Sequence, residues 1–194
     1  MNRIAALLLA LAFACPPASA KDFIASAAAA VANAYQTRPQ DAPASPGIDV
    51  GFSNGNGEGA EAVVLKVIAS AKASLLVASY SFTSPTIAQA LVSARKRGVD
   101  VRVVMDKSQR GERYTSATFL SNMNIPVRID AQHSIMHNKY IIADGAHVQQ
   151  GSFNYTRAGA KSNAENVLAI WNNQPLAQAY ARDWQIHWDH ATAY

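Results

Sequence analysis

The sequence predicts an α/β fold in which a mixed, mainly parallel β-sheet is covered by helices on both faces. Apolar runs rich in β-branched residues alternate along the chain with segments whose apolar residues recur at helical spacing. Hydrophobic residues make up 49% of the 194 residues and charged residues 15%, which excludes a wholly disordered chain. The length suits one globular domain, and no segment repeats at a fixed period.

The first half of the predicted domain consists of strand–helix units. A short strand is expected over 49–53, followed by a glycine-rich turn and a helix that starts near Ala60. The run SLLVASY at 74–80 is typical of a buried strand. Ser84 can cap the next helix, and Pro85 suits its first turn, where the missing N–H costs nothing.

The second half continues the alternation and ends in a long amphipathic helix. The remaining strands are expected over 99–105, 125–129, 138–143, 147–150 and 167–171. Between them, 113–122 is expected to be helical, and Asp144-Gly145 forms a hairpin turn. The closing helix spans 175–190. Its apolar stripe, interpreted as core or dimer packing, consists of Leu176, Tyr180, Trp184 and Trp188.

The first twenty residues are typical of a secretory signal peptide. A positive charge at Arg3 precedes an apolar run, and the small residues at 18–20 predict cleavage after Ala20 and a periplasmic or secreted product. The run is shorter than the roughly 20 residues of a membrane span, so an uncleaved anchor is the weaker alternative. A lipoprotein acylated at Cys15 fits poorly, because bulky Phe13 stands where a small residue is expected.

An alanine- and proline-rich segment over 21–47 is expected to lead into one folded domain over 48–194. Lys and Arg number 17 against 13 Asp and Glu, and this net charge of +4 fits an anionic partner better than a cationic one. The single cysteine excludes an intramolecular disulfide and a cysteine-rich zinc site.

The residues with chemical potential lie between His137 and Glu165. His137 and Lys139 are two apart in a predicted strand, so both project to one face, where an imidazole and an ammonium indicate an anionic substrate such as a phosphate. Ser152 and Asn154, again two apart, offer a hydroxyl and an amide. Glu165 is the best candidate to fix the tautomer of a nucleophilic histidine.

These residues form the pattern H-x-K-x4-D, followed by G-S-x-N and a downstream glutamate, and this pattern resembles the phospholipase D superfamily. Within it, the chain is similar to the small bacterial nucleases that carry one copy of the motif, named HKD. The similarity extends over 50–53, 78–82 and 96–100. It implies the phospholipase D/nuclease fold and a sequence-nonspecific endonuclease that acts on DNA, with RNA as a second candidate substrate.

The resemblance also implies a mechanism that requires no metal and no cofactor. His137 attacks the phosphodiester phosphorus to form a covalent phosphohistidine, and a second His137 protonates the leaving oxygen and then activates water. Glu165 orients the imidazole. Asp144 completes the catalytic motif, with a role that is expected to be structural. The phosphate oxygens are held by Lys139, Ser152 and Asn154.

One motif supplies one histidine, whereas this mechanism needs two. Larger relatives carry two copies of the motif in one chain, but this chain has one. Two chains are therefore expected to form a homodimer with the active site at their interface.

Several residues have competing interpretations. A lone buried histidine is more often structural than catalytic, but the matching site residues weigh against that for His137. His133 stands four residues before it, yet the segment lacks the glutamate of H-E-x-x-H, so no metal is expected. Surface or structural roles are expected for His147, His187 and His190. Candidate nucleic-acid contacts, each equally explained as a solvated basic loop, are Lys107, Arg110, Arg113, Arg157 and Lys161.

Two other functions compete with the nuclease. A phospholipase or phosphatidyl transferase would use the same chemistry on lipid, but such relatives usually carry two motifs, and no apolar lipid-binding insertion is evident. A non-catalytic DNA-binding or envelope-assembly protein is disfavoured, because a pure binder does not need a nucleophile.

Overall fold

The computed structural model describes residues 40–53, 59–113 and 115–194. The predicted signal peptide over 1–20, the segment over 21–39 and most of the predicted turn before Ala60 lie outside the described residues. Within the described part of the chain, no helix is both long and apolar enough to cross a membrane.

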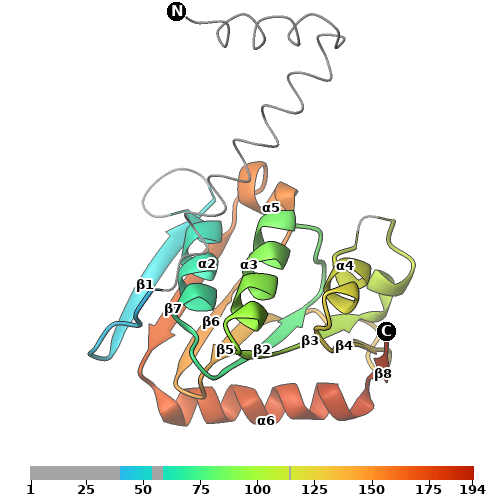
Figure 1. Cartoon of the computed structure of the whole chain (residues 1–194). Coiled ribbons are helices and arrows are strands. Elements are labelled where there is room, and N and C mark those ends of the chain that lie inside the picture. Colours follow the sequence, from blue (N-terminus) through green and yellow to red (C-terminus); the bar gives the residue numbers. More distant parts are fainter. Residues whose placement is uncertain (1–39, 54–58, 114) are drawn as a thin grey trace, which may run out of the picture. The chain divides into compact units, whose positions relative to one another are not determined.

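One eight-stranded sheet organises the domain, with the strand order β1-β7-β6-β5-β2-β3-β4-β8 (Figure 1). The strands are β1 (Gly47–Phe52), β2 (Ser74–Ser79), β3 (Asp100–Asp106), β4 (Val127–Asp130), β5 (Lys139–Ala143), β6 (His147–Gly151), β7 (Asn166–Trp171) and β8 (Thr192–Ala193). Only the β2–β3 and β3–β4 pairings are parallel, and the other five are antiparallel. The sheet is mixed, as predicted, but the expectation of a mainly parallel sheet is wrong.

The connections explain this difference. A parallel neighbour requires a long crossover, and helices supply one from β2 to β3 and another from β3 to β4. Strands β5 and β6 are instead joined by a short connection over 144–146, in which Asp144 and Gly145 have φ values of 54° and 63°, as in a type I′ turn. The predicted Asp-Gly turn is thus confirmed, and it makes this half of the sheet antiparallel.

Helices cover both faces of the sheet (Figure 1). They are α2 (Ala60–Ser70), α3 (Pro85–Lys96), the 3-10 helix η1 (Lys107–Arg110), α4 (Ala117–Asn122), α5 (Arg157–Lys161) and α6 (Gln174–His190). The larger core packs α2, α3 and α4 against one face. On the other face, α6 buries Trp184, which stacks on Trp188 with ring centroids 4.8 Å apart. Its apolar stripe therefore belongs to the core.

The strongly patterned elements agree with prediction to within a few residues. Pro85 opens α3, and the Ser84 side chain accepts the Ile87 N–H as the predicted cap. The helix predicted over 113–122 is only partly correct, because α4 begins at Ala117. Helix α5 and strand β8 were not predicted, since both are too short to show a periodic pattern.

Candidate active site

The two cationic residues of the motif lie where β5 begins. The strand starts at Lys139, so His137 stands in the loop just before it rather than on the strand. His137 is exposed to solvent, whereas Lys139 is only 7% exposed. The Lys139 Nζ donates a hydrogen bond to the carbonyl oxygen of His137 at 2.6 Å. The buried ammonium is therefore held directly beneath the residue that carries the exposed imidazole.

Tyr80 is a neighbour of this pair that the sequence analysis did not identify. It follows β2, and its ring centroid lies 4.5 Å from that of His137 and 5.1 Å from the Lys139 Nζ. Its N–H donates to the carbonyl oxygen of Asn138 at 2.9 Å, which ties β2 to the loop before β5. The one feature of the sequence that could have indicated this role is the position of Tyr80 at the end of the apolar run over 74–80.

Ser152 and Glu165 meet at the same edge of the sheet, after β6 and before β7. The Ser152 Oγ donates to Glu165 Oε2 at 2.6 Å and accepts the Asn166 N–H at 3.1 Å. The Asn163 side chain donates to Glu165 Oε1 at 3.0 Å. Both carboxylate oxygens thus accept hydrogen bonds, and the expected hydrogen bond from the His137 ring to Glu165 is not present among the described residues.

Asn154 adds an amide to this edge. Its side-chain oxygen is buried and has no hydrogen-bond partner in the described part of the chain. Rotation of the amide by about 180° exchanges its oxygen and nitrogen, so the group can offer either an acceptor or a donor. Close backbone approaches shape the surroundings: a Cβ on Gly151 would overlap the carbonyl oxygen of Asn166, and one on Gly159 would lie 2.5 Å from that of Asn154.

The charge at the site depends on Lys139. Burial lowers the pKa of Lys139 below its ordinary value, because removal from water disfavours the charged ammonium. The nearby carboxylate of Glu165 acts in the opposite direction and supports the charge. A cation in a partly desolvated position interacts strongly with an anion that enters beside it.

Asp144 lies at the other end of β5, about 17 Å along the strand from Lys139. Its carboxylate accepts the backbone N–H groups of Lys72 at 2.9 Å and of Ala73 and Ser74 at 2.8 Å. These bonds attach the β5–β6 turn to the connection between α2 and β2. These contacts fit the structural role expected of Asp144. They do not support its inclusion among the catalytic residues.

A buried chain of hydrogen bonds reaches the motif from α6. The Asn138 Nδ2 donates to His187 Nε2 at 3.1 Å, so the Nδ1–H of His187 donates to Asp130 Oδ2 at 2.7 Å. Burial acts to raise the pKa of Asp130, but hydrogen bonds from the Gln132 N–H and from His187 hold it below its ordinary value. His187 is thus structural, as expected, and supports the residue between His137 and Lys139.

The candidate nucleic-acid contacts lie on segments at the same edge of the sheet as the motif. The Lys107 Nζ donates to the carbonyl oxygen of His133 at 3.0 Å, and Arg110 donates to Thr192 Oγ1 at 3.2 Å, so both already have contacts within the chain. All five candidates are exposed to solvent: Lys107, Arg110, Arg113, Arg157 and Lys161.

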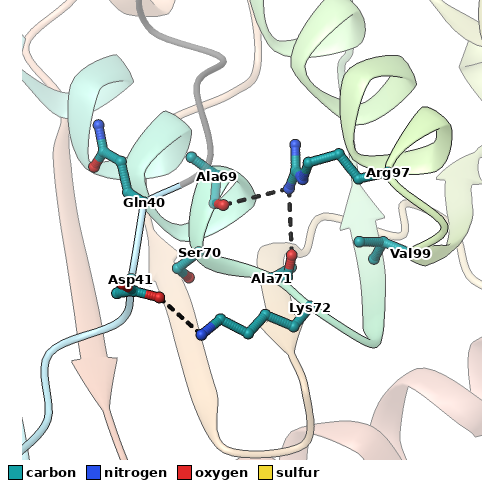
Figure 2. A pocket seen from close by; sticks show the side chains of 8 residues that line it. All are labelled: Gln40, Asp41, Ala69, Ser70, Ala71, Lys72, Arg97 and Val99. Carbon is teal, nitrogen blue, oxygen red and sulfur yellow. Dashed lines mark hydrogen bonds and ion pairs between the residues drawn. The ribbon is translucent and has the colours of Figure 1, made fainter.

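A cavity at the opposite edge of the sheet contains none of the predicted site residues (Figure 2). Its lining consists of Gln40, Asp41, Ala69, Ser70, Ala71, Lys72, Arg97 and Val99. The Arg97 guanidinium donates to the carbonyl oxygens of Ala69 and Ala71, and Lys72 pairs with Asp41 at 2.7 Å. The Arg97 contacts satisfy carbonyl groups at the carboxyl end of α2, and the candidate site lies at the motif edge.

Comparisons with known proteins identify relatives of the chain. A family model described as a cardiolipin synthase, PLD-like domain, matches residues 64–188. The chain is 40% identical over 114 residues to phospholipase D of Rickettsia conorii, which covers 59% of this chain and 56% of that protein. It is 32% identical over 119 residues to mitochondrial cardiolipin hydrolase of Xenopus laevis, and this match covers 61% of this chain and 56% of that protein. The chain thus spans little more than half the length of these relatives.

Two solved structures are similar over most of the chain. Nuc from Salmonella typhimurium, a phospholipase D family member, is 41% identical, with a TM-score of 0.74 over 77% of this chain and 99% of the other. NucT from Helicobacter pylori is 21% identical, with a TM-score of 0.69 over 77% of this chain and 100% of the other. At that lower identity, the second likeness concerns the fold alone.

Proposed function

The chain belongs to the phospholipase D superfamily, and on this premise we propose that it is a metal-independent phosphodiesterase that acts as a sequence-nonspecific endonuclease on DNA. One observation carries the proposal. The exposed imidazole of His137, the buried ammonium of Lys139 and the Ser152–Glu165 pair meet at one edge of the sheet. This arrangement offers a nucleophile in His137 and a cation for phosphate oxygens in Lys139, and the Ser152 hydroxyl can donate to such an oxygen once it turns away from Glu165.

In the proposed reaction, a nitrogen of His137 attacks the phosphorus while the bond from phosphorus to the leaving oxygen breaks. The His137 of a second copy of the chain donates a proton to the leaving oxygen. The same imidazole then removes a proton from water, which attacks the phosphohistidine and releases His137. The negative charge on the phosphate oxygens is stabilised by Lys139, Ser152 and Asn154.

A homodimer is part of this proposal, and the surface of β1 supports it. Ile48, Val50 and Phe52 alternate along this edge strand and are 62%, 43% and 40% exposed, while Gly51 between them faces α2. Phe52 pairs with Asn166, the residue after Glu165, so the apolar strip ends beside the candidate site. A second copy packed on this strip would bring its own motif to the same edge.

The lipid alternative has a specific observation in its favour. The relatives compared above are named phospholipase D and mitochondrial cardiolipin hydrolase. The net charge of +4 and the exposed side chains of Arg157 and Lys161 near the site favour a polyanionic nucleic acid. DNA remains our proposed substrate, with RNA second and phospholipid third.

Export through the predicted signal peptide is also proposed. The test is to sequence the N-terminus of protein recovered from the periplasm or medium of the producing cells. We expect it to begin at Lys21, and retention of Met1 on membrane-bound protein would contradict the proposal.

The decisive experiment is digestion of supercoiled plasmid and single-stranded DNA in excess chelator by the protein and by two histidine variants. We expect cleavage by the wild type and by His190→Ala, which replaces an exposed histidine outside the site. We expect none from His137→Ala. A trapped, acid-labile phosphoprotein would identify the histidine intermediate. Release of choline from phosphatidylcholine vesicles without DNA cleavage would establish the lipid alternative.

A further inference from the structure

Three side chains that can bind a metal converge beside the candidate site but outside the proposed catalytic set. Asp130 ends β4, His133 lies in the following loop, and His187 lies in the last turn of α6. One ligand atom from each residue lies within 4.8 Å of the others. The rings of His133 and His187 are 5.1 Å apart between centroids. Three separate segments of the fold therefore supply the cluster.

The burial of the three residues suits an ion that enters from solvent. Asp130 is fully buried and His187 is 7% exposed, whereas His133 is exposed. The loop that carries His133 is held at both ends, because Asp106 accepts the Met136 N–H at 2.8 Å and Asp130 accepts the Gln132 N–H at 2.9 Å. His133 can thus close over an ion without any rearrangement of the strands.

The donor set points to a particular class of metal. Two imidazoles and one carboxylate suit Zn²⁺ and the similar ions Co²⁺ and Ni²⁺, with a fourth position left for water. Bonds of about 2.0–2.2 Å in a tetrahedral site place neighbouring ligand atoms about 3.4 Å apart. The ligand atoms lie within 4.8 Å of one another, so the widest separation has to shrink by at most about 1.4 Å. A change of rotamer at the exposed His133 can supply this movement.

We infer that Asp130, His133 and His187 form a binding site for one divalent transition metal of the zinc class. Both ring nitrogens of His187 already have partners, Nδ1 in Asp130 and Nε2 in Asn138. Coordination through Nδ1 would turn the Asp130 hydrogen bond into shared coordination of the metal. Nε2 would then carry the proton, and the Asn138 amide would turn to offer its oxygen. Metal binding would thus reach the residue between His137 and Lys139.

Direct binding measurements test this inference independently of the proposed nuclease activity. Chelator-treated, dialysed protein is titrated with ZnCl₂ by calorimetry, and CoCl₂ is added to a second sample to record its visible absorption. We expect one equivalent of Zn²⁺ per chain, a higher Tm with metal, and the visible bands of four-coordinate Co²⁺. We also expect slower amide exchange in the loop over 131–136 when Zn²⁺ is bound.

Two alanine variants identify the ligands. His133→Ala removes an exposed ligand, so the fold should persist while the Zn²⁺ affinity falls at least about tenfold. His190→Ala is the matched control, since its ring lies 6.2 Å from that of His133 but outside the cluster. Absence of Zn²⁺ binding in the wild type, or equal affinity in wild type and His133→Ala, would overturn the inference. Equal loss in the two variants would also overturn it.

Discussion

Replacement of Asp144 by alanine tests whether the last residue of the HKD motif holds the fold rather than taking part in the reaction. The carboxylate accepts three backbone N–H groups, those of Lys72, Ala73 and Ser74. It does so from a residue with φ of 54°, a conformation in which a side chain other than that of Asp or Asn is strained. Alanine would lose the three hydrogen bonds and keep the strained backbone.

The expected cost follows from these contacts. The bond from Ser74 is partly buried, and its loss costs about 1–2 kcal/mol. The other two N–H groups are exposed and regain water, so their loss adds about 0.5 kcal/mol each. The left-handed conformation costs alanine about a further 1 kcal/mol. We therefore expect Asp144→Ala to lower the free energy of unfolding by about 3–4 kcal/mol.

Asp144→Asn is the matched control, because asparagine tolerates the positive φ and keeps one acceptor oxygen. It should cost about 1 kcal/mol. Stability is measured by urea unfolding, and kcat is measured at low temperature on a chromogenic phosphodiester, with each value corrected for the folded fraction. We expect kcat within about threefold of wild type for both variants. A hundredfold loss of kcat in folded Asp144→Ala, with an unchanged urea midpoint, would refute the reasoning.

Three further outcomes are expected. Burial lowers the pKa of Lys139, so kcat should fall as the pH rises through that lowered pKa. Glu165→Gln removes a charge that supports the ammonium, so the fall in kcat should begin at a lower pH in this variant. An unchanged pH profile would contradict the assignment of this fall to Lys139. Gly151→Ala places a Cβ against a backbone carbonyl and should destabilise the protein by about 1–3 kcal/mol in urea, unlike Gly47→Ala, which has open space. Val50→Asp, at a side chain 43% exposed, should dissociate the proposed dimer in sedimentation without unfolding it, and a variant that remains dimeric would locate the interface elsewhere.

The sequence predicted those parts of the fold that depend on local pattern. The cap at Ser84, the Asp144-Gly145 turn and the stripe of α6 are each encoded by residues a few positions apart. Strand pairing is not local in this sense. β1 pairs with β7, and β2 lies between β3 and β5, so the direction of most pairings depends on segments far apart in the chain. A pattern read along one segment does not contain that information.

In the candidate site, too, local patterns were predictable and contacts between distant segments were not. The spacing of the motif residues identified Lys139, Ser152 and Glu165, which the structure places at one edge. The contacts that Tyr80 and His187 make with the motif were not predicted, because they come from the end of β2 and from α6 and span long stretches of sequence. The role expected of Glu165 was inferred from the need of a nucleophilic histidine for a partner, whereas its carboxylate accepts hydrogen bonds from Ser152 and Asn163.

The path of the chain explains why one copy of the motif supplies the proposed phosphate-binding residues but only one imidazole. Strands β5, β6 and β7 follow one another as antiparallel neighbours, so the chain returns to the same edge at Lys139, after Gly151 and before Asn166. Each return places polar groups beside the previous ones, and about 30 residues suffice to collect them. His137 precedes the first of these strands, and the meander contains no second position equivalent to it. Under the proposed mechanism, the second imidazole must come from a second meander. A single-motif chain can obtain that meander from another copy of itself, and the apolar strip on β1 that ends beside Asn166 is where we expect the two copies to meet.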